Sequence, residues 1–358
     1  MATFDVQVRR LEAVEPHLQA DRLELARLGG YRCVVAKGQF RAGDLVAYLP
    51  EAAVLPEALI AELGLTGKLA GPDADRIHAV KLRGALSQGV VMAARPGWHE
   101  GQSVMEELGV RKFEPEIPPD LLGVVYALER CEGHGFDVEN LKAYPDLFVL
   151  GEPVVLTEKI HGVLLAVGAA TPTEARPESG HWQGRAWVSS KGLLAQRLAF
   201  DFHAADTPNL YLRVAAAYDL PRRAVALADR FGDQVLVFGE VFGTGVQDLA
   251  YGGAAGMPGF RVFAVRVGER FLDDVELETV LVEAALERAP VLYRGPYDPG
   301  VVQAYTDGSE AVSGLSSHLR EGVVITPQQE RDDPRVGRAI AKSVSAAYLL
   351  RQGGTEYS

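Results

Sequence analysis

The chain has 358 residues, of which 47% are hydrophobic and 23% are charged, a globular balance that excludes disordered, collagen-like and coiled-coil proteins. Its net charge of −12 excludes a general basic coat for nucleic acid, although residues 1–100 are neutral overall. No apolar run is long enough for a membrane span, no signal pattern opens the chain, and Cys33 and Cys131 support neither a disulfide framework nor a zinc site, so we expect a cytoplasmic protein without a membrane partner.

Residues 1–95 are predicted to form a small barrel. Short apolar runs alternate with glycine-rich turns, and they predict strands at Phe4–Leu11, Tyr31–Ala36, Leu45–Leu49, Ile77–Leu82 and Gly89–Ala93. One short helix is expected at Pro56–Leu63, because proline is common in the first turn of a helix. Several strands in so few residues favour a closed barrel.

The rest of the chain is predicted to be a connector followed by a mixed domain. Prolines interrupt residues 96–136, whereas residues 137–358 alternate strands with helices. The expected strands are Pro153–Thr157, Val163–Val167, Gln234–Phe238, Arg261–Val267 and Gly322–Thr326. Long helices are expected at Thr207–Phe231 and Asp273–Arg288, an exposed loop at Thr171–Gly180, and a strand with a short helix at Arg335–Arg351. The fold class is therefore α+β.

One stretch carries the clearest chemical signal. A β-branched run ends in Thr157-Glu158-Lys159-Ile160-His161-Gly162, so a lysine stands at a strand end with a glycine three residues later. The glycine permits a tight backbone beside the lysine. A lysine becomes a nucleophile when neighbouring cations or desolvation lower its pKa from about 10.4. Taken alone, this spacing is more often a surface lysine leaving a strand.

Later residues add complementary chemistry in a fixed order. Glu240 and Glu321 each stand on or before an apolar strand, Phe263 lies within another strand, and Lys342 returns a cation near the chain end. Singly, each has an ordinary structural explanation. Together they supply a nucleophile, two carboxylates for Mg²⁺ or Mn²⁺, an aromatic ring for a purine and a cation for phosphate.

This ordered set resembles the covalent nucleotidyltransferases, which are DNA ligases, RNA ligases and capping enzymes. The resemblance makes Lys159 the adenylated lysine of the first motif and Glu240, Phe263, Glu321 and Lys342 the third, adenine-stacking, fourth and fifth motifs. It also places Thr157, Glu158, Ile160, Gly162, Ser189 and Lys191 around the nucleotide, with Glu158 reading the base edge. Two departures stand out: Val163-Leu164 replaces a Thr-Asn pair, and Ile340 replaces the first lysine of the fifth motif, for which Arg338 is the candidate substitute.

Within this superfamily, the chain is most similar to the Deinococcus-type RNA ligases. The residues after Lys342 are too few for the second OB domain of DNA ligases and capping enzymes, whereas Ala20–Leu25, Gly43–Pro50 and Arg83–Val90 resemble an OB fold of the tRNA-binding type. The resemblance implies an OB-type barrel at 1–95, a connector at 96–136, and a nucleotidyltransferase (ATP-grasp-like ligase) domain of antiparallel sheets flanked by helices at 137–358.

It further implies an ATP-dependent RNA ligase that uses Mg²⁺ or Mn²⁺ and seals 3′-OH/5′-phosphate nicks through lysyl–AMP. The partner would be a nicked duplex whose 3′-OH strand is RNA, with no obligate protein partner. Candidate nucleic-acid contacts on the barrel are Arg9, Arg10, Arg32, Lys37, Arg41, Lys81 and Arg83. The alternatives are a DNA ligase, a GTP-dependent capping-type enzyme, an NAD-dependent ligase, and a non-catalytic RNA-binding protein. The barrel could also serve packing or dimerisation, and Glu240 could bind the ribose instead of metal.

Overall fold

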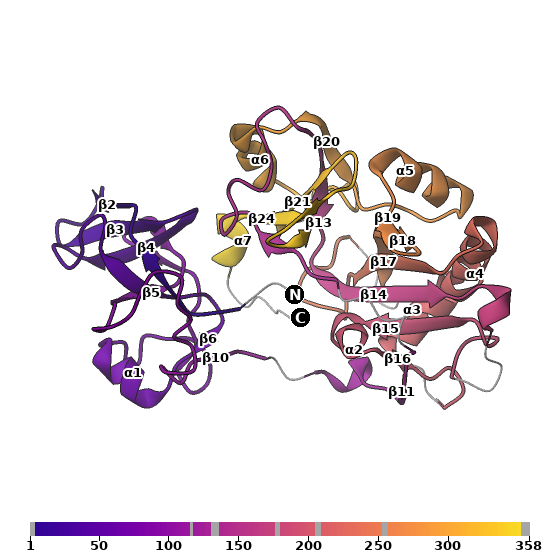
Figure 1. Cartoon of the computed structure of the whole chain (residues 1–358), viewed down its shortest axis with the longest axis horizontal. Coiled ribbons are helices and arrows are strands. Elements are labelled where there is room, and N and C mark those ends of the chain that lie inside the picture. The colour runs from indigo at the N-terminus through magenta and orange to yellow at the C-terminus, as the bar shows by residue number, and fades with distance from the viewer. Residues whose placement is uncertain are drawn as a thin grey trace. The chain divides into compact units, whose positions relative to one another are not determined.

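The computed structural model describes residues 4–114, 117–129, 136–175, 180–204, 209–252 and 257–351. Cys131, Thr207 and Pro208 lie outside these residues, as does part of the expected loop Thr171–Gly180. The chain forms two compact units: an N-terminal unit of residues 2–114 with 139–147, and a C-terminal unit of 115–138 with 148–358 (Figure 1). The expected connector is therefore divided, with residues 96–114 in the N-terminal unit.

The N-terminal unit consists of short antiparallel strands and one short helix. Its sheets have the strand orders β1-β5-β9, β2-β3-β4, β6-β10 and β7-β8. The elements are β1 (Gln7–Arg10), β2 (Ala13–Pro16), β3 (Leu23–Leu28), β4 (Tyr31–Ala36), β5 (Leu45–Leu49), β6 (Ala53–Val54), α1 (Glu57–Glu62), β7 (Val80–Leu82), β8 (Ala85–Ser87), β9 (Val90–Ala93), β10 (Arg111–Lys112) and β12 (Glu139–Asn140).

Strand β5 shows why these residues form a barrel. Ala47 and Leu49 belong to one hydrophobic cluster with Val8, whereas Val46 and Tyr48 belong to a second. A strand that is buried on both faces needs a continuous apolar run, which is what its sequence provides. The predicted bounds of β4 and β5 match the structure, while β1, β7 and β9 begin later than predicted, because residues 4–6, 77–79 and 89 lie outside any strand.

The C-terminal unit is larger and mixes sheets with helices. Its elements are η1 (Pro119–Leu121), β11 (Val125–Ala127), β13 (Pro153–Lys159), β14 (Gly162–Ala169), η2 (Pro172–Glu174), β15 (Ala186–Ser190), α2 (Lys191–Ala195), β16 (Leu198–Phe200), α3 (Leu210–Ala217), α4 (Leu220–Phe231), β17 (Val235–Phe242), β18 (Gly259–Val267), β19 (Arg270–Phe271), α5 (Asp274–Glu283), β20 (Val291–Pro296), α6 (Pro299–Thr306), β21 (Gly322–Pro327), β22 (Asp332–Asp333), β23 (Gly337–Arg338), β24 (Ala341–Val344) and α7 (Ala346–Leu349).

Two antiparallel sheets organise this unit. The larger has the order β11-β16-β15-β14-β17-β18-β19, and helices α3 and α4 pack on it (Figure 1). The second contains β24, β21, β13 and β20 in that order. Only Ile160 and His161 separate β13 from β14, so the chain passes from one sheet to the other immediately after Lys159.

The two long predicted helices are shorter in the structure. The region predicted as Thr207–Phe231 is divided into α3 and α4, because Asp219 adopts a left-handed backbone (φ 53°) and Pro221, which lacks an N–H, stands in the first turn of α4. The helix predicted to reach Arg288 ends at Glu283. Arg288 instead forms a bridge with Val262 of β18.

Candidate active site

A cavity of about 340 Å³ lies in the C-terminal unit and is lined by residues of both sheets. This volume is in the range of small-molecule sites. The predicted site residues that line it are Thr157, Glu158, Lys159, Ile160, Gly162, Lys191, Glu240, Phe263, Arg338 and Lys342. Ser189 is instead fully buried, with its hydroxyl donating to the Leu198 carbonyl at 2.7 Å, and Ser190 takes its place on the wall.

Lys159 ends β13 and contacts Glu321 directly. Its ammonium lies 2.6 Å from Glu321 Oε1. Lys159 pairs with Gly322 of β21, and this register brings the preceding glutamate beside it. A side chain at Gly322 would collide with the Ser343 carbonyl, so glycine allows β24 to approach. Glu321 Oε2 is buried and has no hydrogen-bond partner among the described residues, which leaves one carboxylate oxygen available.

Glu240 enters the cavity from β17. Its strand lies so close to β14 that a Cβ at Gly162 would collide with the Val241 carbonyl, which explains the glycine of the first motif. Burial raises the pKa of Glu240 to about 8; Lys159 opposes this rise and Glu321 adds to it. Glu240 and Glu321 therefore form a coupled pair of carboxylates beside Lys159.

Three lysines gather at these carboxylates. Burial lowers the pKa of Lys342, and the charges of Lys159 and Lys191 lower it further. All three line the cavity, and they are the only lysines in residues 148–358, where the other basic side chains are arginine and a few histidines. Unlike arginine, a buried lysine can lose its proton near neutral pH. Within residues 148–358, the scarcity of lysine is therefore a signal in the sequence that points to the cavity.

Arg338 reaches the cavity wall in a different setting. Its guanidinium donates to Glu330 at 2.8 Å and lies 4.0 Å from the centre of the Phe271 ring. Its Nη1 is buried without a hydrogen-bond partner among the described residues. The structure thus places Lys191 among the charges that act on Lys342, while Arg338 has a carboxylate partner of its own.

A β-bulge orients Phe263. Phe238 pairs with Ala264 and Gly239 with Val262, so Phe263 is the extra residue of β18. Bulges redirect one side chain and recur beside active sites. The Phe263 ring lines the cavity and packs 5.0 Å from the ring of Phe136, which the sequence analysis did not select.

Glu158 alternates to the opposite side of β13 from Lys159, as successive strand residues do. Its side chain is 0% exposed, and Oε2 accepts the Ala311 N–H at 2.7 Å and lies 3.9 Å from Arg320. Burial raises the pKa of Glu158 to about 7, against the lowering effects of Ala311 and Arg320. The carboxylate therefore contacts the loop before β21, although the residue borders the cavity.

His161 anchors the first motif through residues that sequence reasoning missed. Nε2 lies 2.7 Å from Asp248 Oδ1, Nδ1 lies 2.7 Å from the Tyr348 hydroxyl, and the backbone N–H donates to Tyr251. Burial lowers the pKa of His161, which favours a neutral ring that donates to Asp248 and accepts from Tyr348. Arg351 pairs with Asp248 at 3.0 Å. No linear spacing connects these positions.

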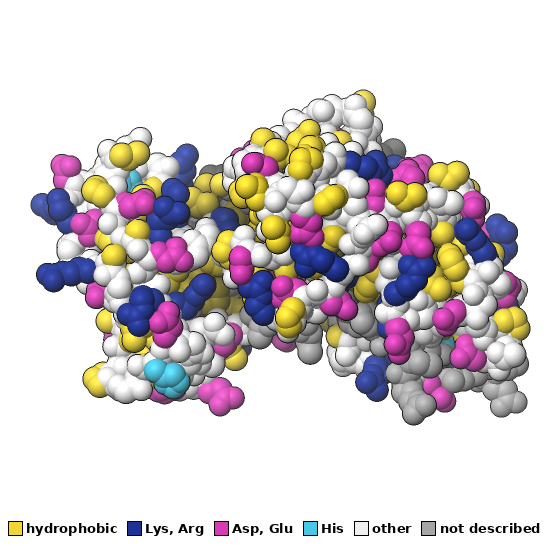
Figure 2. Space-filling view, turned by 45° about the horizontal axis from the view of Figure 1, so that its top comes forward, with side chains coloured by type: hydrophobic (Ala, Val, Ile, Leu, Met, Phe, Trp, Pro, Cys, Tyr) yellow, Lys and Arg dark blue, Asp and Glu magenta, His cyan; other side chains and the backbone are white. Residues whose placement is uncertain are grey.

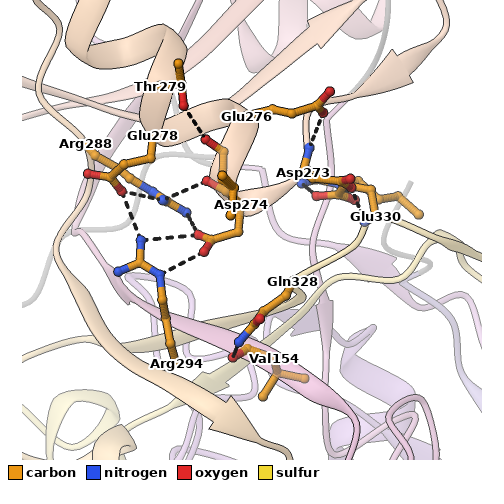
Figure 3. A network of polar contacts seen from close by, with 12 residues as sticks. Val154, Asp273, Asp274, Glu276, Glu278, Thr279, Arg288, Arg294, Gln328 and Glu330 are labelled. Carbon is orange, nitrogen blue, oxygen red and sulfur yellow. Dashed lines mark hydrogen bonds and ion pairs between the residues drawn. The ribbon is translucent and has the colours of Figure 1, made fainter.

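Figure 3 shows the polar network that braces one wall of the cavity. Asp274, the first residue of α5, accepts from Arg288 at 2.6 Å and from Arg294 at 2.8 Å. Burial acts to raise the pKa of Asp274, but these two arginines outweigh it and the pKa is lowered. Glu278 accepts from both arginines. The network holds the Arg288 segment, which lies between Phe263 and the first motif.

Comparison with protein families identifies the chain. A model described as RNA ligase matches residues 152–344, more than half of the sequence, so the chain belongs to the RNA ligase family. A second family, described as an OB-fold domain, matches residues 5–94. The α+β architecture of an N-terminal OB-type barrel and a ligase domain with antiparallel sheets and helices is thereby confirmed. No curated protein sequence matches the chain closely enough to count as a relative.

Solved structures of one RNA ligase, from Naegleria gruberi, share the fold. A lysine-to-alanine variant with ATP and manganese has a TM-score of 0.77 at 19% identity, covering 97% of this chain and 98% of that chain. The enzyme with pyrophosphate and a glutamate-to-alanine variant with AMP and manganese each have a TM-score of 0.77 at 19% identity, covering 96% of this chain and 97% of theirs. Among the described residues, no helix is both long and apolar enough to cross a membrane.

Proposed function

We propose that this RNA ligase uses ATP and joins a 3′-OH end to a 5′-phosphate end through a lysyl–AMP intermediate on Lys159. The observation that carries the proposal is the contact of Lys159 with Glu321, because Lys159 lines a cavity together with Glu240, Lys342 and Phe263. Family membership supports ligation of RNA. The nucleotide, the nucleophile and the nicked substrate are what the proposal adds.

The reaction has three transfers. The neutral amine of Lys159 attacks the α-phosphorus of ATP, so that a P–N bond forms, the bond to pyrophosphate breaks and the amine proton leaves. The 5′-phosphate of one strand then attacks the adenylate, forming a P–O–P linkage and restoring the amine. The 3′-OH of the other strand attacks the activated 5′-phosphorus, which forms the phosphodiester and releases AMP.

The surroundings of Lys159 support this role. Glu321 orients the amine by accepting its hydrogen bond, while the positive charges of Lys191 and Lys342 disfavour a third ammonium at the same point. The same two cations suit the negative charge that builds on the α-phosphate in the transition state.

The two carboxylates fit a divalent metal ion. Glu240 and Glu321 offer hard oxygen donors, and Glu321 Oε2 is a buried acceptor without a partner among the described residues. Mg²⁺ is usually held in proteins by one or two carboxylates, which two glutamates can provide, together with substrate phosphates and water. When bound, the ion would offset charge on the phosphate oxygens.

For the base, we propose that Phe263 stacks on adenine. The bulge presents its ring to the cavity, and the ring of Phe136, which also lines the cavity, packs against it. We propose ATP instead of GTP as the nucleotide, because structures of the Naegleria ligase, which has the same fold, contain ATP or AMP. Glu240 remains a candidate for the ribose hydroxyls as well as for metal.

The nucleic-acid partner we propose is a nicked duplex with an RNA 3′-OH strand. Figure 2 shows basic and acidic side chains intermixed on the visible face of the N-terminal unit. Residues 1–100, which make up most of this unit, are neutral in total, unlike the acidic remainder of the chain. Arg9 and Arg10 line a groove beside β1; Arg10 is paired with Glu100, whereas Arg9 forms no ion pair with a described residue. OB folds bind nucleic acid on one barrel face, so we propose that this unit is the nucleic-acid-binding domain.

Labelled nucleotide and a denaturing gel test the adenylation step. The protein is incubated with α-labelled ATP and Mg²⁺ or Mn²⁺, and Lys159→Ala is compared with Lys112→Ala, which changes an exposed lysine on β10. We expect a covalent adduct in the wild type and in Lys112→Ala, and none in Lys159→Ala or with GTP. An adduct of normal yield in Lys159→Ala would refute the assignment.

A second experiment tests the substrate. Nicked duplexes that differ only in a ribose or a deoxyribose at the 3′-OH end are sealed in parallel. We expect the ribose end to be joined faster. Equal rates would contradict the RNA preference while leaving lysyl–AMP formation untouched.

A further inference from the structure

We propose that Asp137 is a positioning residue that holds Lys191 in the nucleotide-free site and gives it up to the phosphates of ATP. Asp137 Oδ1 lies 3.4 Å from Lys191 Nζ, and both residues line the cavity. This inference rests on the proposed function, because it assigns an additional part of the same site.

Asp137 is fixed in place by its neighbours. Phe136 is 8% exposed and packs among the rings of Phe238 at 4.9 Å and Phe263 at 5.0 Å. Asp137 Oδ1 also accepts the N–H of Val138 at 3.2 Å. The backbone at Asp137 is thus anchored beside Phe263, the proposed adenine-stacking residue. The Asp137 carboxylate faces Lys191.

The charge balance explains why this carboxylate matters. Asp137 acts on Lys342 as well, since its negative charge opposes the lowering of the Lys342 pKa by burial and by the other lysines. It therefore reduces the positive potential of the whole lysine cluster. A triphosphate must compete with Asp137 for this potential, whereas Glu321 is engaged with Lys159.

Lys191 can leave Asp137 for a phosphate at little cost, because the ion pair is partly exposed to solvent. The Lys191 side chain is 38% exposed and that of Asp137 is 23% exposed. Ion pairs of this kind contribute about 0–1 kcal/mol. Removing the Asp137 charge, which competes with the phosphates for Lys191, would therefore lower the KM for ATP by up to about fivefold. A residue with a purely structural role would give a loss on substitution instead of a gain.

The test is the ATP dependence of self-adenylation. We expect Asp137→Asn to lower the KM for ATP by about two- to fivefold without raising kcat, at saturating Mg²⁺. Asp229→Asn is the matched control. Asp229 pairs with Arg185 at a distance of 2.6 Å, and neither residue lines the cavity, so the KM of this variant should match that of the wild type. If thermal melting shows that Asp137→Asn is unfolded, Asp137→Ser removes the same charge.

A double-mutant cycle asks whether the gain passes through Lys191. In Lys191→Met, the additional Asp137→Asn change should lower the KM by much less than it does in the wild type. An unchanged or higher KM in Asp137→Asn, or an equal gain in the Lys191→Met background, would overturn the inference. Absence of any adduct in the wild type would refute the proposed function instead, so the two failures are distinguishable.

Discussion

The two carboxylates near Lys159 differ in their surroundings. Glu321 is engaged by the Lys159 ammonium, whereas burial raises the pKa of Glu240 to about 8. Burial therefore favours the protonated form of Glu240, whereas an approaching cation favours its ionised form. The same residue type is thus prepared for two roles by its surroundings.

Glu321→Gln should separate binding from chemistry. The amide keeps the shape but loses the charge that pairs with Lys159, so we expect self-adenylation to fall by about 100-fold or more while ATP still binds. The measurement is labelling rate beside a direct ATP binding curve. Glu152→Gln, which alters a pair with Arg331, serves as the control and should label normally.

Phe263→Leu should weaken ATP use more than it weakens the fold. Loss of base stacking costs about 1–3 kcal/mol, or roughly a 5- to 150-fold weaker interaction. Phe271→Leu is the control, because Phe271 packs on Phe136 without lining the cavity. A collapse of the melting temperature with normal ATP affinity in the remaining folded enzyme would show that Phe263 only fills the core.

Glu310 should make stability depend on acid. Burial acts to raise the pKa of this carboxyl, but hydrogen bonds from the hydroxyls and N–H groups of Ser313 and Ser317 outweigh it and lower the pKa to about 2. A lowered folded-state pKa stabilises the protein above the unfolded-state value of about 4.3, and this stabilisation is lost as the pH falls toward 2.

We therefore expect Glu310→Gln to be less stable than the wild type at pH 7 by up to roughly 3 kcal/mol, with the difference shrinking below pH 4. Denaturant unfolding at several pH values measures this. The exposed Glu269→Gln should follow the wild-type curve. A difference that stays constant from pH 7 to pH 3 would contradict the prediction.

Single elements show what sequence alone can and cannot predict. Strands β4 and β5 were predicted with their observed bounds, because continuous apolar runs and glycine turns are local signals. The division of the predicted helix at Asp219 was missed, although Pro221 marks it, because the apolar spacing continues across the break. The bulge at Phe263 leaves no local signal, since it depends on the register with β17.

The same limit applies to the site. The order of Lys159, Glu240, Phe263 and Lys342 was predictable, and the structure brings them to one cavity. Asp248 and Tyr348 were not, because they meet His161 only through tertiary packing. A pair of residues that far apart in sequence has no periodicity to reveal it.

Helix α7 provides a test of that packing. Tyr348→Phe removes the hydroxyl that donates to His161 Nδ1 and leaves the ring in place, so the free energy of unfolding should fall by about 0.5–1.5 kcal/mol. Denaturant unfolding measures the change. Tyr293→Phe removes an exposed hydroxyl bonded to the Pro296 carbonyl and should cost less. If both variants lost the same free energy of unfolding, the buried hydrogen bond between Tyr348 and His161 would contribute no more than an exposed one.

At the scale of the whole molecule, the net charge of −12 decides how a polyanion can be held. A duplex must be bound through local basic contacts, and each phosphate contact releases counterions. We therefore expect nick sealing to fall more steeply than self-adenylation between about 50 and 200 mM salt. Rates of both reactions, measured in the same salt series, check this, and parallel curves would contradict it.

Because the only lysines in residues 148–358 are the three that line the cavity, peptide mapping can report on Lys159 directly. A protease that cleaves only after lysine can cut the denatured chain beyond residue 143 only after Lys159, Lys191 and Lys342. A phosphoramidate on Lys159 blocks one of these cuts, so peptides 143–159 and 160–191 are replaced by a single peptide spanning 143–191 that carries AMP. A digest kept at neutral pH, where this acid-labile bond survives, would therefore report the occupancy of the nucleophile as a ratio of peptides, without any labelled nucleotide.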